Sequence, residues 1–201
     1  MAIYHLSATV ISRARGERIV AVAAARSATR LRDARYGITH NHLHKHGVAH
    51  AEIMAPAGAP AWTHDREALW NRVEAAERRW DSQLARAIEV GLPVELSHEQ
   101  GVALIREYLA QEFVVHGMIA DFSIRRSDPR NPHAHVLLTL RPVTASGFGP
   151  KARHWNRKSN LLEWRTAGRV EAAVPAKRPI KPIYTKRFLA PIEAAKGMGT
   201  K

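Results

Sequence analysis

Two apolar runs joined by a short polar loop constrain the fold of this chain most strongly. Residues 118–126, MIADFSIRR, alternate between apolar and polar side chains, and residues 134–141 form a second run of strand-forming residues. The loop SDPRNP separates them. Such a pattern predicts two neighbouring strands that pair as an antiparallel hairpin.

Two histidines stand at the start of the second run. His133 and His135 are separated by Ala134, and residues at positions i and i+2 of a strand point to the same face. Two neutral imidazoles at this spacing can share one divalent ion. The alternative is that they are only two polar residues at the start of a strand.

The rest of the chain predicts helices interleaved with further strands. Residues 3–12 and 50–54 are expected to be strands. Helices are expected over residues 18–32, from 63 or 64 to 89, and over 99–116, where Ser97 and Gln100 match a capping box. Helices on a mostly antiparallel sheet indicate an α+β sandwich of two or three layers.

The net charge points to a polyanionic partner. The 201 residues include 31 Lys and Arg against 18 Asp and Glu, a formal charge of +13. Nucleic acid is the first candidate and an acidic membrane surface the second. No apolar run approaches the ~20 residues that span a bilayer, so we expect no membrane insertion. The absence of cysteine excludes disulfides and thiolate zinc sites.

Basic residues cluster in two places that could follow a nucleic-acid backbone. The first cluster lies in the first predicted helix, where charges near the C-terminus also complement the helix dipole. The second lies in the loop after the last strand, where Trp155 could stack on a base. The candidates are Arg26, Arg30, Arg32, Lys151, Arg153, Arg157 and Lys158.

A histidine-rich tract lies between the first two predicted helices. It contains His40, His42, His44, His46 and His50. In an extended segment, the first four rings would lie on one face and could bind a metal. A solvated hairpin is the other interpretation.

Several segments together resemble a known family. MAIYHLSATVISRARGER, SATRLRD, HDREALWNRVEAAERR, SQLARAIEVGLP and NPHAHVLLTLRP follow one another as in the relaxase domain of the MobA/MobL family, plasmid mobilisation proteins of the His-hydrophobic-His endonuclease superfamily. The resemblance runs from residue 1 to about 165. It implies a palm-like five-stranded antiparallel sheet with flanking helices, and residues 166–201 are expected to form a basic, proline-containing extension.

The resemblance also implies an activity. Proteins of this family bind single-stranded DNA at a plasmid transfer origin, together with other relaxosome proteins in the bacterial cytoplasm. A tyrosine attacks the phosphodiester to nick one strand and later rejoins it. A divalent metal, Mn²⁺ or Mg²⁺, held by three histidines stabilises the charge on the phosphate.

This chain departs from the family pattern at two site positions. Ala25 occupies the place of the nucleophilic tyrosine, and Tyr36 is the only plausible substitute. Arg125 occupies the place of the third metal-binding histidine, beside His133 and His135, and an arginine cannot ligate a metal. It could instead bind a phosphate with its own charge.

Glu77 matches a glutamate of the family, so it either supports the metal or is an exposed helix-surface residue. We therefore expect a chain, engineered or degenerate, that binds DNA but is inactive for strand transfer. The alternatives are a non-catalytic nucleic-acid-binding module and a nuclease with another nucleophile, either Tyr36 or a metal-bound water.

Overall fold

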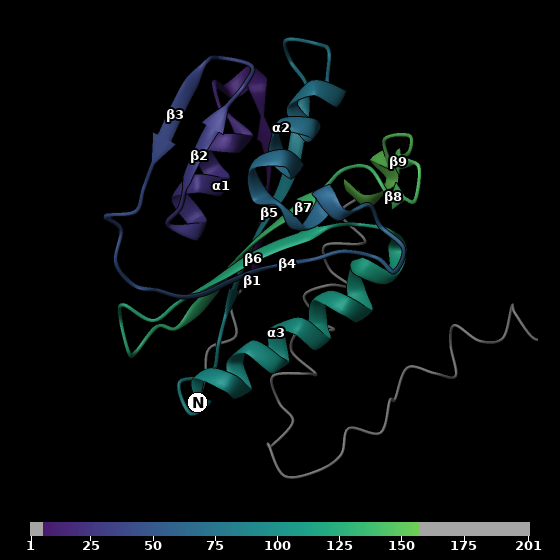
Figure 1. Cartoon of the computed structure of the whole chain (residues 1–201). Coiled ribbons are helices and arrows are strands. Elements are labelled where there is room, and N and C mark those ends of the chain that lie inside the picture. Colours follow the sequence, from purple (N-terminus) through teal and green to yellow (C-terminus); the bar gives the residue numbers. More distant parts are fainter. Residues whose placement is uncertain (1–5, 157–201) are drawn as a thin grey trace, which may run out of the picture.

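A five-stranded antiparallel sheet forms the centre of the computed structural model, which describes residues 6–156 (Figure 1). The spatial order of its strands is β1–β5–β7–β6–β4, and every neighbouring pair is antiparallel. The strands are β1 (Leu6–Ser12), β4 (Val48–Met54), β5 (Gln83–Gly91), β6 (Ala120–Arg125) and β7 (His133–Thr139). The predicted α+β fold with a five-stranded antiparallel sheet is confirmed.

Strands β6 and β7 form the hairpin that the alternating pattern predicted. Phe122 lies opposite Val136, and Ser123 lies opposite His135. Because alternate side chains point to opposite faces, Val136 packs into the core beneath one face while His135 and Leu137 face the other side.

Helix α3 (His98–Glu112) covers the first face. The predicted capping box is present: Gln100 N donates to Ser97 Oγ at 3.2 Å, and Ser97 N donates to the Gln100 side chain at 2.9 Å. A 3-10 turn, η3 (Val114–His116), follows the helix, and Gly117 ends it in the left-handed conformation. The core side chains here include Ile105, Tyr108, Leu109, Phe113, Phe122, Ile124, Val136 and Leu138.

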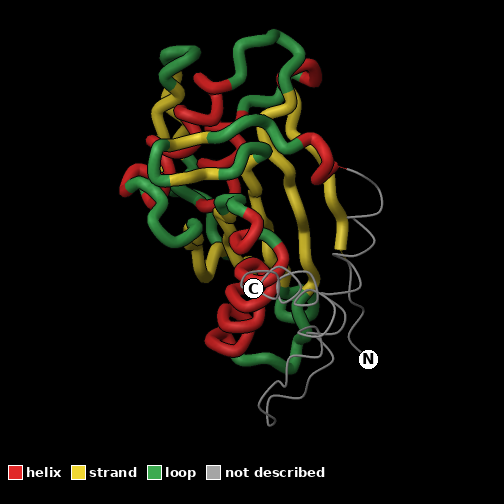
Figure 2. Tube along the Cα trace, turned by 90° about the vertical axis from the view of Figure 1, so that its right-hand side faces the viewer, coloured by secondary structure: helices red, strands yellow, loops and turns green. Residues whose placement is uncertain are grey.

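Helices α1 (Ile19–Ser27) and α2 (Arg66–Ala76) cover the opposite face, so the sheet lies between α3 and this pair (Figures 1 and 2). A buried carboxylate fixes α2 to β6. Asp121 accepts a hydrogen bond of 2.8 Å from Trp70 Nε1 and forms a 2.9 Å ion pair with Arg66. The fold is therefore a three-layer sandwich.

The first predicted helix is shorter than expected. Helix α1 ends at Ser27 because Ala28 adopts a left-handed conformation, with φ of 54°. Strand β2 (Arg30–Asp33) follows and pairs with β3 (Ile38–Asn41) in a separate two-stranded sheet. The prediction of helix over residues 28–32 is thus wrong.

The prediction of one long helix up to residue 89 is also wrong, beyond residue 76. Helix α2 ends at Ala76, and the chain re-enters the sheet as β5, between β1 and β7. Residues 84–88 are all buried, because the strand has packed layers on both of its faces. A continuously buried strand does not alternate, so its sequence cannot be distinguished by period from a buried helix.

Five short elements complete the described part of the chain, the first of which is a 3-10 turn, η1 (Arg13–Arg15), after β1. A 3-10 turn, η2 (Ala61–His64), precedes α2, and β8 (Val143–Thr144) pairs with β9 (Gly147–Phe148) after β7. A last 3-10 turn, η4, spans Arg153–Asn156. Arg157, Lys158 and the predicted boundary between residues 165 and 166 lie outside the described residues. Between residues 6 and 156, no helix is long and apolar enough to cross a membrane.

Candidate functional site

The two histidines of β7 lie side by side on the face of the sheet that α1 covers. The ring centroids of His133 and His135 are 4.9 Å apart, with the rings nearly perpendicular. His133 Nδ1 lies 2.8 Å from the Asn131 carbonyl oxygen. Because a carbonyl oxygen only accepts, Nδ1 of the neutral ring carries the proton, and the lone pair on Nε2 is left for another partner.

His135 is held in its neutral form. Burial, and then the charges of Arg26, His133 and Arg125, lower its pKa to about 4. The nearest carboxylate, Glu89, lies opposite on β5, but its Oε2 is 3.8 Å from His135 Nδ1 and makes no hydrogen bond with it. A neutral, partly buried imidazole therefore stands beside two arginines.

Arg125 lies directly opposite His133 in the β6–β7 register. A guanidinium is cationic at any accessible pH and has no lone pair for a metal. Within residues 6–156, no three His, Cys, Asp or Glu side chains come together in a way that could hold an ion. The donor set at the histidine pair therefore does not fit the divalent metal that the resemblance implies.

The C-terminal end of α1 lies against the same part of the sheet. Arg26 Nη1 donates to the Val136 carbonyl oxygen at 3.3 Å, and Ser123 Oγ donates to the Arg26 carbonyl oxygen at 2.9 Å. Burial lowers the pKa of Arg26. Ala25, the residue before it, is only partly buried. The position expected for the nucleophile is thus adjacent in sequence to a residue that contacts β7 beside His135.

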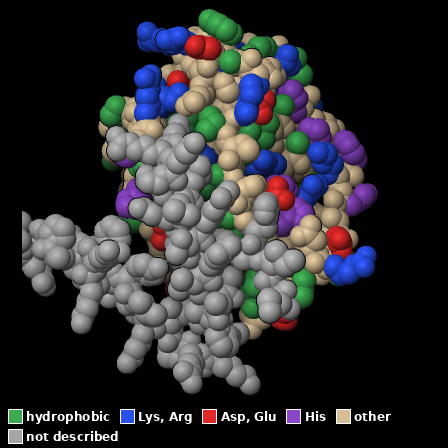
Figure 3. All heavy atoms as spheres, turned by 180° about the vertical axis from the view of Figure 1, so that it is seen from behind, with side chains coloured by type: hydrophobic (Ala, Val, Ile, Leu, Met, Phe, Trp, Pro, Cys, Tyr) green, Lys and Arg blue, Asp and Glu red, His purple; other side chains and the backbone are tan. Residues whose placement is uncertain are grey.

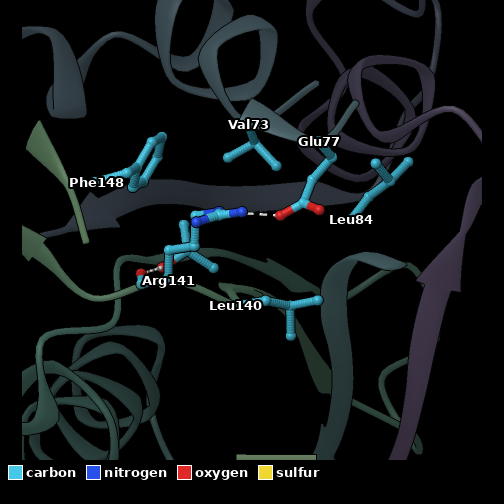
Figure 4. A pocket seen from close by; sticks show the side chains of 7 residues that line it. Val73, Glu77, Leu84, Leu140, Arg141 and Phe148 are labelled. Atoms are coloured by element: carbon cyan, nitrogen blue, oxygen red, sulfur yellow. Dashed lines mark hydrogen bonds and ion pairs between the residues drawn. The ribbon is translucent and has the colours of Figure 1, made fainter. Parts of the chain in front are cut away.

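Glu77 lies near the other end of β7. Its Oε1 accepts from Arg141 Nε and its Oε2 from Lys151 Nζ, both at 3.0 Å, beside a small pocket (Figure 4). Arg141 is eight residues beyond His133, roughly 25 Å along an extended chain. The structure therefore does not bring Glu77 to the histidine pair. The alternative of an exposed helix-surface residue is wrong, because Glu77 is buried.

The expected basic residues occupy different environments. Arg30 and Arg32 lie on β2, rather than on a helix, and both are exposed on the side opposite Leu31 and Asp33. Arg153 is exposed in η4, whereas Lys151 is engaged with Glu77. Figure 3 shows histidine and basic side chains gathered along the edge where β3 and the β6–β7 loop lie.

Trp155 does not lie where a base could stack on it. Only 8% of its surface is exposed, and it packs into the core beneath α3. Sequence reasoning instead missed Trp80, which is 76% exposed in the loop between α2 and β5. The neighbouring Arg78 and Arg79 were the available sign of a surface loop, but the helical spacing of the surrounding apolar residues concealed it.

The histidine-rich tract does not form one face. His40 lies on β3, near the buried Asp33, with His40 Nε2 and Asp33 Oδ2 3.6 Å apart. His50 lies on β4, where its Nε2 is 2.8 Å from Glu52 Oε2 and its ring contacts Phe122, on the α3 side of the sheet. Strand β3 ends at Asn41, and a turn at Leu43 and His44 follows, in which Lys45 N donates to the His42 carbonyl oxygen at 2.9 Å, so residues 40–46 are not one extended segment.

Tyr36 lies away from the histidines. Its ring stacks beneath the guanidinium of Arg18, 4.4 Å from the ring centroid, and Arg18 is the residue that precedes α1. Helix α1 has nine residues and is roughly 13 Å long, and Arg26 lies at its other end. The structure thus does not bring Tyr36 to the histidine pair.

Comparison with known proteins gives consistent matches. The MobA/MobL family profile matches residues 18–179. "Conjugal transfer protein TraA" of Rhizobium radiobacter is 41% identical over 161 residues, covering 75% of this chain and 14% of that protein. "Mobilization protein MobL" of Acidithiobacillus ferridurans is 36% identical over 178 residues, covering 76% of this chain and 46% of that protein.

A solved structure also matches. It is described as "Molecular Basis of Vancomycin Resistance Transfer in Staphylococcus aureus", with a TM-score of 0.79 and 34% sequence identity. The match covers 85% of this chain and 91% of that one. The chain thus corresponds to nearly all of this structure, but to less than half of either relative named above.

Proposed function

The chain belongs to the MobA/MobL family, and on that premise we propose that it is a relaxase-fold protein of plasmid mobilisation that binds single-stranded DNA at a transfer origin but does not perform strand transfer. It would act in the bacterial cytoplasm, with other proteins of a relaxosome. The similarity to a conjugal transfer protein and a mobilisation protein supports this assignment.

Charge supports a DNA partner. The chain carries a formal charge of +13, and Arg26 and Arg125 add positive charge at the histidine pair. Arg30, Arg32 and Arg153 add exposed cations. Neutralising DNA phosphates with such side chains releases counterions, which makes binding dependent on salt.

The predicted inactivity in strand transfer rests on one observation: Ala25, at the position of the nucleophile, has no nucleophilic side chain. A methyl group carries no oxygen that could attack phosphorus. Among the described residues the tyrosines are Tyr36, stacked under Arg18, and Tyr108, which is 2% exposed in the core beneath α3. Neither of these environments adjoins the histidine pair, so no tyrosine within residues 6–156 replaces the missing one.

Fluorescence anisotropy with a labelled single-stranded oligonucleotide tests the binding. The apparent association constant should fall between ~50 and ~200 mM salt, with a linear dependence of log K on log salt. A slope near zero, or stronger binding to duplex of the same sequence, would overturn the proposed partner. In the same samples, denaturing gel electrophoresis should show no covalent protein–DNA adduct. An adduct would overturn the predicted inactivity.

A further inference from the structure

Positively charged side chains surround the histidine pair and favour the binding of an anion there. Arg125 lies opposite His133, and Arg125 Nε is buried without a hydrogen-bond partner within the described residues. Arg26 approaches from α1, with its Nη1 bonded to Val136 O. Two permanent positive charges thus act on the histidine pair.

The carboxylates near this site do not neutralise the positive charges of Arg125 and Arg26. Glu89 faces His135 from β5, at 3.8 Å, and is 44% exposed. Asp121, which also acts on Arg26 electrostatically, is already bonded to Arg66 and Trp70. None of the three carboxylates that act on Arg26 electrostatically, Glu89, Asp121 and Glu17, forms an ion pair with Arg26 or Arg125, so these guanidinium groups are available to an anionic ligand.

We propose that the site formed by His133, His135, Arg125 and Arg26 binds one phosphate of the DNA backbone directly, without a divalent metal. A guanidinium presents a planar fork of N–H donors that matches two phosphate oxygens. His135 Nδ1, buried and without a hydrogen-bond partner, is an additional polar atom at the site. A divalent ion would meet only two imidazoles and would be repelled by both arginines.

This inference rests on the proposed function, because the phosphate is taken to belong to single-stranded DNA. The family resemblance implies a bound divalent cation at the phosphate, whereas here the guanidinium groups of Arg125 and Arg26 would supply the positive charge. No bond is made or broken, and the site only holds the strand.

Dimethyl phosphate, a model phosphodiester, is a direct probe of the site. In the presence of EDTA, its titration should shift the ring-proton NMR signals of His133 and His135 in the wild-type protein. In a separate sample without EDTA and without dimethyl phosphate, added Mn²⁺ should not broaden these signals selectively. Selective broadening by Mn²⁺, or no shift with dimethyl phosphate, would overturn the proposal.

Substitutions of Arg125 provide a second test of the phosphate site. Arg125→Gln should weaken oligonucleotide binding in EDTA about tenfold, since a charge-assisted hydrogen bond is lost. Arg125→Lys keeps the charge but not the fork and should lose less. Arg130→Gln is the matched control, because Arg130 is 95% exposed in the nearby β6–β7 loop. It should change affinity less than twofold.

Thermal unfolding of each variant verifies that the fold is intact, and Arg125→Lys provides the test if Arg125→Gln does not fold. Equal affinities of the Arg125→Gln and Arg130→Gln variants would overturn the phosphate site while leaving DNA binding standing. Failure of the wild-type protein to bind any oligonucleotide would instead overturn the proposed function.

Discussion

Arg125 of β6 lies directly opposite His133 of β7 in the register of the central hairpin. Cross-strand neighbours on one face of an antiparallel pair have Cβ atoms ~5 Å apart. A permanent positive charge therefore stands next to the histidine pair, at the position where the family resemblance implies a third metal ligand. The same pairing underlies both the predicted absence of metal and the proposed phosphate site.

Glu77 is predicted to stabilise the fold rather than to assist a metal. Its carboxylate is 9% exposed and pairs with Arg141 and Lys151. Glu77→Gln leaves two cations facing each other without a counter-charge, so the free energy of unfolding should fall by about 2 kcal/mol, measured by urea denaturation. Glu95→Gln, at an exposed position, should change it by less than ~0.5 kcal/mol. Equal effects of the two substitutions would contradict this assignment.

His135 should make stability depend on pH. Its pKa is lowered from 6.5 to about 4 in the folded protein, so between these values the unfolded chain binds a proton that the folded protein does not. Stability should therefore fall as the pH drops from 6.5 to 4, by roughly 3 kcal/mol from this group alone. Urea denaturation at several pH values measures the change.

His135→Gln is the control for this pH dependence, because it removes the titrating ring. The variant should lose the part of the slope between pH 6.5 and pH 4 that His135 supplies. If wild type and variant have the same dependence of stability on pH, His135 is not held neutral in the folded protein.

Trp155 and Trp80 should respond in opposite ways to substitution. Trp155→Ala removes a buried side chain and should lower the free energy of unfolding by about 3 kcal/mol. Trp80→Ala should change stability by less than ~0.5 kcal/mol, because Trp80 is largely exposed. If a base stacks on Trp80, its loss weakens oligonucleotide binding by ~1–3 kcal/mol.

Urea denaturation and anisotropy titration on the same two variants separate these effects. A stable Trp155→Ala protein with weakened oligonucleotide binding would restore the sequence-based expectation that Trp155 contacts DNA. Unchanged binding by Trp80→Ala would remove Trp80 from the DNA-contacting surface.

Local patterns were sufficient to predict the β6–β7 hairpin and the capped helix α3. The family resemblance, not the local pattern, placed Arg125 beside His133 and His135, and in the structure Arg125 lies opposite His133 in the β6–β7 register. Strand β5 could not be predicted, because its burial depends on β1 and β7, which come from distant parts of the chain. A strand covered on both faces carries no alternation that distinguishes it from a helix.

The errors at the site have the same physical origin. Glu77 and Lys151 are 74 residues apart in sequence, and only the tertiary structure reveals that they are paired. Trp155 was expected to be accessible from its basic surroundings, yet it completes the core beneath α3. Residues whose partners lie far along the chain could not be assigned from composition or spacing.

Covalent capture of DNA by a repaired variant tests the central claim most directly. Ala25→Tyr combined with Arg125→His restores both a hydroxyl nucleophile and a third imidazole. With Mn²⁺ and a single-stranded transfer-origin oligonucleotide, the double variant should form an adduct on a denaturing gel and Ala25→Tyr alone should form less. Arg125→His alone and the wild-type protein, which both lack the nucleophile, should form none. Adduct formation by the wild-type protein, or a double variant that neither binds Mn²⁺ nor cleaves the oligonucleotide, would contradict the account.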